Sequence, residues 1–366
     1  MAKPMVKAAV LTGVRQMEIR EFPRPVIKDN DALLKVEMVG VCGSDPGMYT
    51  GKNKLVKYPV IPGHEIVGRI EEIGDYKAEI SGCKVGDRVV VETRFGCGVC
   101  PACISGQYGK CVKNLGYGFH LGANDPPYLW GAYSEYLYLP ERAILHKISE
   151  DIPLETGALI CAVIGNAVRW LNLIGESSIG ENVAILGPGQ QGLGAVCVAK
   201  ESGAKNIFVT GKSCDKKRLA LAKEYGANHI INVDEVDAVE YIRDITHGDM
   251  CDLIMDVSGS ADAMATTPDM IGKLGTIVVP GLYGTDKRVP YDFDKLVYKE
   301  VTIKGAHTHN MDSVARAISL VESKKYAFEK MVTHKFPLKD AEKAIQIAGG
   351  EFPEEEQIKV VIEPNK

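Results

Sequence analysis

A glycine-rich turn between an apolar run and a helical run constrains the fold of this chain more than any other feature. The run 181–187 (ENVAILG) has the character of a buried strand, and the run 190–203 has helical character. Glycines in such a unit permit a tight turn and let the backbone approach a bound pyrophosphate, which the helix N-terminus then faces. The alternative is a glycine-rich turn without a ligand. The strand–turn–helix context instead predicts a dinucleotide site formed by Gly187, Gly189, Gln190, Gln191 and Gly192.

Strand-like and helical runs alternate beyond about Pro153. Strand-like runs occur at 206–210, 229–233, 252–257 and 275–281, and a further helical run occupies 216–226. Strands that alternate with helices form a parallel, doubly wound sheet. This half of the chain is therefore predicted to have an α/β fold.

The first half of the chain is rich in Gly, Pro and β-branched residues, with alternating stretches at 32–41, 85–92 and 132–140. Such stretches predict a β-rich, partly barrel-like domain. A chain of 366 residues is too long for one ordinary core, so two domains are expected. We predict a β-rich domain over 1–160, completed by a helix at 311–323 and a last strand within 301–366, and a doubly wound domain over 161–300.

Composition excludes some classes of partner. A formal charge of -5 without any basic tract disfavours nucleic-acid binding. The N-terminal apolar run is too short for a signal peptide, and no later run suggests a membrane span, so we expect a cytoplasmic protein. Ten cysteines in a reducing compartment favour metal or catalytic use over disulfides.

Four cysteines in one short loop are the densest chemical signal. Cys97, Cys100, Cys103 and Cys111 are spaced to surround a tetrahedral Zn²⁺ with no coordination position left for water, as in a structural site. The alternatives are four unrelated cysteines or one redox pair. Cys83, Cys197, Cys214 and Cys251 have no such neighbours and are interpreted as packing or surface residues.

A second set of possible metal ligands is more dispersed. A catalytic zinc needs about three protein ligands and one open position, which Cys42, His64 and Cys161 can supply. Alone, His64 would be interpreted as a structural histidine and Cys161 as a small buried residue. Their neighbours supply further groups: Ser44 can take a hydroxyl proton, Asp45 can orient the His64 imidazole, and Glu65 can approach the metal.

The pieces VCGSD, PVIPGHEIVGRI and VGDRVVVE, together with the four-cysteine loop, resemble the medium-chain, zinc-containing alcohol dehydrogenase family over essentially the whole chain. The resemblance implies a GroES-like catalytic domain and a Rossmann domain, with the active site in the cleft between them. It implies that Cys42, His64 and Cys161 hold the catalytic zinc and that Ser44 relays the proton. The expected reaction moves a hydride between a secondary alcohol and a nicotinamide cofactor, and we expect a homodimer or homotetramer.

Two residues depart from the family pattern. Cys161 stands where sorbitol dehydrogenase-like enzymes have glutamate, although the rest of the chain is similar to the polyol and threonine dehydrogenase branch. Gly47 stands where relatives often have a proton-relaying histidine, and His120 and His307 are candidate substitutes. A threonine-like or sugar dehydrogenase, or a non-catalytic NADP-binding zinc protein, remain alternatives.

The end of the second strand of the doubly wound domain bears on the choice of cofactor. NAD enzymes usually have a carboxylate there, whereas this chain has Gly211, Lys212 and Ser213. A cation and a hydroxyl suit a 2′-phosphate, with Arg218 as a further cation, so the sequence favours NADP. Asp215 lies close to this turn in the sequence, so NAD remains the alternative cofactor.

The substrate pocket is weakly specified by the sequence. The aromatic and polar segment 116–136 is a candidate lid. Four residues near the motifs could line the pocket or belong to the core: Tyr49, Thr93, Phe95 and Trp130.

Overall fold

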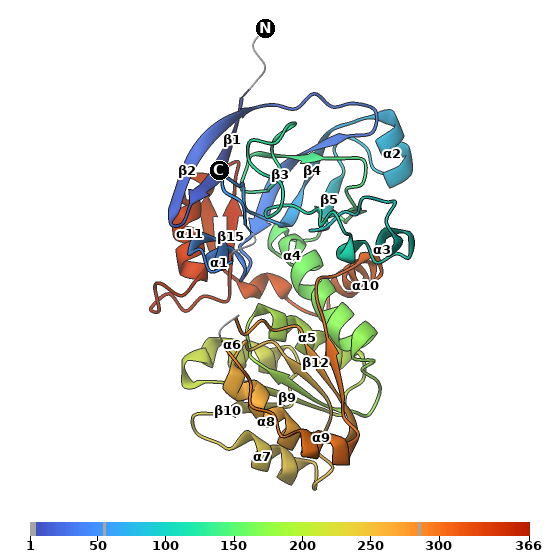
Figure 1. Ribbon diagram of the computed structural model, residues 1–366, viewed down its shortest axis with the longest axis vertical. Helices are drawn as coiled ribbons and strands as arrows, with labels where there is room; N and C mark the ends of the chain where they lie inside the picture. The colour runs from blue at the N-terminus through green and yellow to red at the C-terminus, as the bar shows by residue number, and fades with distance from the viewer. Residues whose placement is uncertain (1–4, 54–55, 285–286) are drawn as a thin grey trace. The chain divides into compact units, whose positions relative to one another are not determined.

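The computed structural model describes residues 5–53, 56–284 and 287–366. The chain divides into two compact units, and each is described by itself below (Figure 1). Unit 1 comprises 1–162 and 309–366, and unit 2 comprises 163–308. The sequence predicts these boundaries at 160/161 and 300/301.

Unit 1 is β-rich. A seven-stranded sheet has the order β14-β15-β3-β4-β5-β7, with β6 also paired to β3, and β1 and β2 form a separate antiparallel hairpin. Its strands are β1 (Met5–Gly13), β2 (Gln16–Pro23), β3 (Ala32–Gly40), β4 (Glu65–Ile73), β5 (Arg88–Val91), β6 (Tyr136–Leu139), β7 (Leu145–Lys147), β14 (Val332–Pro337) and β15 (Lys359–Glu363). Its helical segments are α1 (Asp45–Tyr49), α2 (Asp75–Ser81), α3 (Pro101–Ile104), η1 (Tyr108–Lys110), α4 (Leu154–Leu159), α10 (Met311–Glu322), η5 (Phe328–Met331), η6 (Leu338–Asp340) and α11 (Ala341–Ala348).

The core of unit 1 follows from the apolar composition of β3. Seven of its nine residues are buried, and its backbone is paired on both edges, with β4 along one edge and with β15 and β6 along the other. The last strand, β15, pairs antiparallel with β3 and so returns the end of the chain to this unit. Two predicted strands are shorter than expected: β5 covers only Arg88–Val91 of 85–92, and β6 only Tyr136–Leu139 of 132–140.

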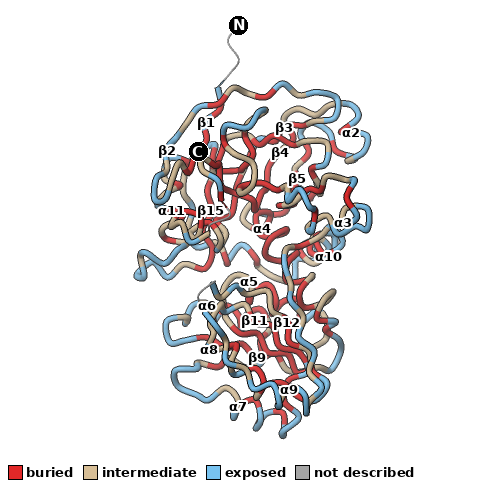
Figure 2. Tube along the Cα trace, in the orientation of Figure 1, coloured by how far each residue is buried: buried red, intermediate tan, exposed pale blue. Residues whose placement is uncertain are grey.

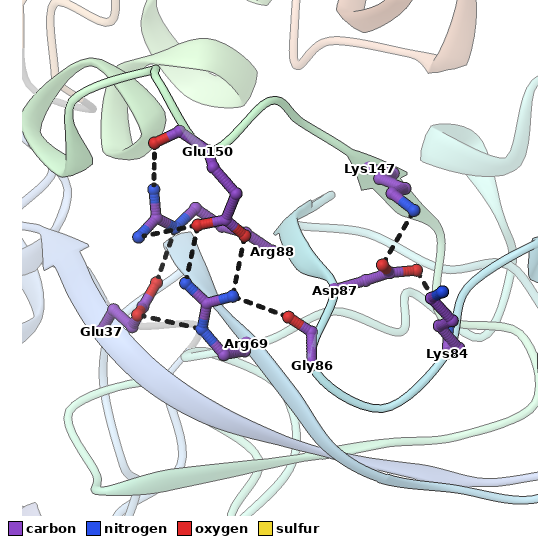
Figure 3. A network of polar contacts seen from close by, with 8 residues as sticks. All are labelled: Glu37, Arg69, Lys84, Gly86, Asp87, Arg88, Lys147 and Glu150. Carbon is purple, nitrogen blue, oxygen red and sulfur yellow. Dashed lines mark hydrogen bonds and ion pairs between the residues drawn. The ribbon is translucent and has the colours of Figure 1, made fainter.

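A network of ion pairs joins β3, β4 and β5 to the segment that precedes α4 (Figure 3). Arg88 Nε lies 3.0 Å from Glu37, and Arg69 Nη1 lies 2.8 Å from Glu150. Beside it, Lys147 Nζ on β7 lies 2.8 Å from Asp87. Glu150 is mostly exposed, so each pair contributes little stability alone, but together they fix the approach of the chain to α4.

Unit 2 is a parallel, doubly wound sheet. The strand order β10-β9-β8-β11-β12-β13 is 3-2-1-4-5-6 in chain order, which is the Rossmann arrangement. Figure 2 shows the central strands as buried and much of the outer helices α7 and α9 as exposed. Its elements are η3 (Val168–Ile174), β8 (Asn182–Leu186), α5 (Gln190–Glu201), β9 (Asn206–Gly211), η4 (Ser213–Asp215), α6 (Lys216–Glu224), β10 (His229–Asn232), α7 (Ala238–Ile245), β11 (Cys251–Asp256), α8 (Ala261–Met270), β12 (Ile271–Val279), α9 (Phe293–Lys299) and β13 (Thr302–Gly305).

The sequence-based expectation that no run is apolar enough to span a membrane is wrong for the helical stretch Leu154–Ile174. Its 21 residues are long and apolar enough to cross a membrane, although no such run was expected. Within the structure, 78% of its apolar window is buried. Much of it, including η2 (Ile160–Gly165), has the wider π-helical turn, which is common near functional sites. Its apolar character is therefore explained by packing inside the protein.

Candidate active site

The four-cysteine loop brings its thiols together within a short stretch of chain. The Sγ atoms of Cys97, Cys100, Cys103 and Cys111 all lie within 4.8 Å of one another. Gly96 permits this closeness, because a Cβ at that position would lie 2.4 Å from Cys103 Sγ. Four sulfur ligands with this spacing match a closed tetrahedral site.

Backbone groups of this loop favour a thiolate at Cys100, whereas burial raises the pKa of Cys103 to about 11. Peptide N–H groups of Val112 and Cys103 lower the pKa of Cys100 to about 6. The Cys97 peptide N–H similarly donates to Cys111 Sγ at 3.3 Å. Metal ligation requires deprotonated cysteines, so these donors prepare the loop for a cation.

The second cluster assembles from separate parts of unit 1. Ligand atoms of Cys42, His64 and Glu65 lie within 4.8 Å of one another. Cys42 lies between β3 and α1, whereas His64 and Glu65 lie at the start of β4. Gly63 allows this turn: its φ is +95°, and a Cβ there would lie 2.5 Å from the Tyr133 ring.

Asp45 and its neighbours orient this cluster. Asp45 Oδ2 accepts hydrogen bonds from the Cys42 peptide N–H at 2.9 Å and from Tyr133 OH at 3.0 Å. Its Oδ1 lies 3.7 Å from His64 Nδ1. Thr93 Oγ1 donates to the His64 carbonyl oxygen at 3.0 Å. The Thr93 hydroxyl thus fixes the backbone of His64, and the Asp45 carboxylate lies beside the imidazole without a hydrogen bond to it.

A buried ion pair that the sequence did not reveal holds Glu65. Lys359 Nζ, at the start of β15, contacts Glu65 Oε2 and donates to the Val41 carbonyl at 3.0 Å. Both side chains are at most 1% exposed. The only sequence signal was a lysine at the start of the mostly apolar strand KVVIE. This signal does not identify the residue with which the lysine pairs.

Burial dominates the electrostatics of the cluster. Desolvation raises the pKa of the Cys42 thiol to about 12, with further contributions from Glu65 and Asp45, and lowers the pKa of His64 to about 3. Burial likewise raises the pKa of Asp45 to about 7. Among the described residues, Asp45 Oδ1, His64 Nδ1 and Glu65 Oε1 are buried without a hydrogen-bond partner. A cation would satisfy such a set of donor atoms, and thiolate with imidazole suits zinc.

Cys161 lies outside this cluster. It is buried in η2, and burial, Glu92 and Glu65 raise its pKa well above the usual value. It is therefore close enough to both carboxylates to feel their charge, but its Sγ is not among the ligand atoms that lie within 4.8 Å of one another. Its role as the third ligand stays a prediction, and Glu65 occupies the third place in the observed set.

The proposed proton-relay residues occupy different surroundings. Ser44 precedes α1, and its buried hydroxyl oxygen has no hydrogen-bond partner among the described residues. Gly47 has open space around it, with Asn53 Cβ 4.0 Å from an added Cβ. His120 Nε2 lies 2.6 Å from Asn114 Nδ2 in unit 1, whereas His307 belongs to unit 2, where its carbonyl accepts from Trp170.

Most candidate pocket residues belong to the core. Phe95 and Trp130 are buried and contact each other with ring centroids 6.4 Å apart. Tyr49 OH donates to Glu342 at 2.7 Å. Within the candidate lid 116–136, Tyr117 and Tyr133 are fully buried, so these aromatic residues pack inside the unit.

The glycine-rich turn of unit 2 lines a cavity of about 670 Å³. A Cβ at Gly192 would lie 2.0 Å from the Gly187 carbonyl oxygen, and Gly187 has a φ of +102°. Both positions therefore require glycine, as expected for a dinucleotide turn. Gly187 and Gly189 line the cavity, whereas Gln190, Gln191 and Gly192 form the first turn of α5 behind them.

Charged residues lie at the end of β9 in the same cavity. Gly211, Lys212, Asp215 and Arg218 line it. Asp215 accepts from the Lys212 peptide N–H at 3.0 Å and from Arg218 at 3.2 Å, so its carboxylate is engaged. The Ser213 peptide N–H donates to Asp234 at 2.8 Å. Gly211 is enclosed, because a Cβ there would lie 2.9 Å from Pro188.

Sequence reasoning also missed a polar connection from the four-cysteine loop. Buried Glu92 accepts from Tyr108 OH at 2.6 Å and lies 2.8 Å from His146 Nε2. Tyr108 OH in turn accepts from the Met311 peptide N–H at 2.6 Å. Glu92 directly follows the apolar residues of β5. A carboxylate at that position is the one sequence signal that could have indicated this connection.

Comparisons with known proteins agree with this architecture. The alcohol dehydrogenase GroES-like domain matches residues 28–150, and the zinc-binding dehydrogenase domain matches residues 192–323. A probable alcohol dehydrogenase of Mycobacterium tuberculosis is 35% identical, with 95% of each chain covered. The erythritol/L-threitol dehydrogenase of Mycolicibacterium smegmatis is 33% identical over 98% of each chain. The crystal structure of an alcohol dehydrogenase from Thermotoga maritima has a TM-score of 0.89 at 30% identity, covering 99% of this chain and 100% of that one. The chain therefore belongs to the zinc-dependent medium-chain alcohol and polyol dehydrogenase family, whose reaction transfers a hydride between an alcohol and a nicotinamide dinucleotide.

Proposed function

We propose that this enzyme uses one zinc ion for catalysis, held by Cys42, His64 and Cys161, and a second, structural zinc held by the four-cysteine loop. The observation that carries the catalytic assignment is the buried cluster of Cys42, His64 and Glu65, whose inward-facing polar atoms lack partners among the described residues. Glu65 is the alternative third ligand, because it is already close to Cys42 and His64.

A zinc ion at this site would supply Lewis acidity, which lowers the pKa of an alcohol hydroxyl toward neutrality. The protein's own groups then have defined tasks. Ser44, beside Cys42, is placed to accept the hydroxyl proton. Asp45 and Thr93 hold His64 in one orientation, and Lys359 balances the charge of Glu65.

We further propose NADP as the preferred cofactor. Lys212 and Arg218 line the cavity at the end of β9, and no carboxylate stands at Gly211. Lys212 and Ser213 could pair with a 2′-phosphate, while Arg218 adds charge nearby. NAD is the alternative, supported by Asp215, although that carboxylate already binds Lys212 N–H and Arg218.

The substrate class is a secondary alcohol, polyol or sugar. The M. smegmatis relative, named for erythritol and L-threitol, supports a polyol. A threonine-like or sugar dehydrogenase of the same fold is the second candidate, supported by an L-threonine 3-dehydrogenase that is 32% identical.

Metal analysis combined with a substrate panel tests the proposal. We expect two zinc atoms per chain and NADP-dependent absorbance change at 340 nm with polyols or other secondary alcohols. One zinc atom per chain and no turnover with any alcohol would instead indicate a non-catalytic NADP-binding protein. Sugars and amino alcohols in the panel separate the second candidate from the first.

We also propose that the protein is a homodimer or homotetramer in the cytoplasm. A homodimer or homotetramer is supported by exposed apolar residues at the edge strand β13, with Ile303 on that strand at 44% exposure and Tyr298, four residues before it, at 84%. Light scattering on the purified protein decides between these states and a monomer. All ten cysteines are free, which fits the reducing cytoplasm.

A further inference from the structure

Arg94 lies directly after a residue that supports the candidate catalytic metal site. Thr93 bonds the His64 carbonyl, and Arg94 follows it in a segment that runs antiparallel to residues 115–117. The guanidinium of Arg94 donates to Asn114 Oδ1. Arg94 is partly buried, and its positive charge contributes to lowering the pKa of His64 and His120, so it lies near both.

The charge of Arg94 lacks an anionic partner. Within the part of the chain that the structure describes, its guanidinium forms no ion pair, and burial alone shifts its pKa, downward. Other partly buried arginines of unit 1 behave differently. Arg24 pairs with Glu71 and Glu72, whereas Arg69 and Arg88 each pair with Glu37 and Glu150. A cation withheld from water without a partner is costly, so its retention points to an external anion.

A second donor beside Arg94 is also unmatched. Because Asn114 Oδ1 accepts from Arg94, its amide nitrogen faces His120 Nε2 at 2.6 Å and donates to it. The neutral tautomer of His120 then carries its proton on Nδ1. Nδ1 is buried and has no hydrogen-bond partner among the described residues. Two donors linked through Asn114, the Arg94 guanidinium and the His120 Nδ1–H, thus have no anionic acceptor among the described residues.

This cluster adjoins the metal site through an aromatic contact. The ring of Phe119 lies 4.2 Å from the ring of His64, and its other neighbour is His120, with ring centroids 5.7 Å apart. A group bound by Arg94 and His120 is therefore a short distance from a substrate oxygen at the proposed zinc.

We propose that Arg94 and His120 bind an anionic group of the substrate, a carboxylate or a phosphate, so that the enzyme acts on an acidic alcohol such as a sugar acid or a polyol phosphate. The proposal rests on the proposed function, because it places this group beside the site where the alcohol is oxidised. Arg94 supplies a planar fork that matches either anion, and Asn114 orients both donors.

Matched substrates test this specificity. Initial rates are compared for erythritol, erythritol 4-phosphate and erythronate, which share a carbon chain and differ in charge. We expect kcat/KM to favour one anionic substrate by at least about tenfold, because a charge-assisted contact contributes about 1.5–3 kcal/mol. The phosphate and carboxylate arms show which anion the site takes.

Variants assign the effect to Arg94. In Arg94→Gln, the preference for the anionic substrate should fall about ten- to a hundredfold, mainly through KM, and Arg94→Lys should restore part of it. Lys57→Gln removes an exposed charge from the same unit and should leave the preference unchanged. An equal loss for neutral and anionic substrates in Arg94→Gln, or a wild type indifferent to charge, overturns the proposal.

Direct binding keeps the test independent of turnover and of mutant folding. Inorganic phosphate and acetate are titrated into the zinc-loaded wild type by calorimetry, with competition against erythritol where turnover is found. Binding of either anion that is lost in Arg94→Gln supports the site, and absence of binding by both in the wild type overturns it. Failure of the proposed function is distinguishable, since it would abolish turnover of neutral and anionic substrates alike.

Discussion

The two candidate metal sites of unit 1 are built in opposite ways. The four-cysteine loop takes all its ligands from a stretch in which the first and last are 14 residues apart. The buried cluster takes Cys42 from the segment between β3 and α1, His64 from the residue before β4 and Glu65 from the start of β4, and its supporting lysine lies 294 residues from Glu65. One site is local in sequence, and the other exists only when the whole unit has folded.

The two sites also differ in the pKa values of their cysteines. In the loop, peptide N–H groups lower the pKa of Cys100 to about 6, which favours a thiolate there, although burial raises the pKa of Cys103 to about 11. In the buried cluster, burial and the charges of Glu65 and Asp45 raise the pKa of Cys42 to about 12. A zinc ion bound by Cys42 would therefore have to displace the thiol proton. The loop should thus serve stability, whereas the buried cluster should serve reactivity.

The strongest test removes a ligand from the buried cluster. Cys42→Ala or His64→Ala should lower kcat by about 10³-fold or more, because the Lewis acid contributes several kcal/mol to the transition state. The melting temperature should change little, since the four-cysteine loop is intact. Cys214→Ala, which removes an exposed thiol, serves as the control. Most of the wild-type kcat remaining in either variant would refute a catalytic metal here.

A ligand removed from the loop should produce the converse pattern. Zinc binding is worth about 10 kcal/mol in small zinc domains, and Cys100→Ser forfeits part of it. We expect a clearly lower melting temperature, lower solubility and zinc content reduced from two to one, with kcat affected only indirectly. Calorimetric melting and metal analysis measure these changes, with Cys214→Ser as the matched control. Normal stability with selective loss of activity would mean that the two assignments are reversed.

The locality of a feature also decided how well the sequence predicted it. The four-cysteine loop and the glycine turn at 187–192 are contiguous, so spacing alone indicated their geometry. The alternation of strands and helices predicted the parallel, doubly wound sheet, which the structure shows with the order 3-2-1-4-5-6. In contrast, Lys359 and Tyr133 reach the buried cluster through strand pairing and tertiary packing, and no sequence pattern names such partners.

Aromatic residues show a second limit of prediction from sequence. The segment 116–136 suggested a lid by its composition, but Tyr117 and Tyr133 are fully buried in the core of unit 1. Composition cannot distinguish an aromatic ring that faces a substrate from one that faces the core, because both positions favour the same side chains. The orphan charge of Arg94 likewise emerged only when the ion pairs of the other partly buried arginines of unit 1 were known.

Removing the distant support of the buried cluster sharpens the comparison. Lys359→Met leaves Glu65 as a buried carboxylate without its counter-ion, which typically costs about 3–5 kcal/mol. The double variant Lys359→Met/Glu65→Gln should lose less stability than Lys359→Met alone, because no unpaired charge remains. Denaturant unfolding of both variants and of Glu65→Gln completes the cycle. Additive losses would show that the pair does not act as a unit.

The nucleotide-binding turn is intermediate between a site that is local in sequence and one that is assembled by folding. Its residues are contiguous at 211–218, but neighbouring residues limit which side chains fit. Its variants have the smallest predicted effect. Gly211→Asp would be an obvious switch toward NAD, yet a Cβ there would meet Pro188 at 2.9 Å and Leu219 at 3.0 Å. Lys212→Ala is the cleaner variant, since Lys212 is exposed at the mouth of the cavity. It should weaken NADPH binding about ten- to a hundredfold, the effect of one charge-assisted contact, and leave NADH binding nearly unchanged.

Lys216→Ala, which removes an exposed lysine of α6 that does not line the cavity, provides the control for Lys212→Ala. Cofactor fluorescence titrations measure both affinities, and kcat/KM for the two cofactors in the wild type gives a first answer. A wild type that prefers NAD tenfold or more would contradict this assignment. Asp215 would then have to release Arg218 and accept the ribose hydroxyls, and the specificity of this turn would depend on rearrangement rather than on its local sequence.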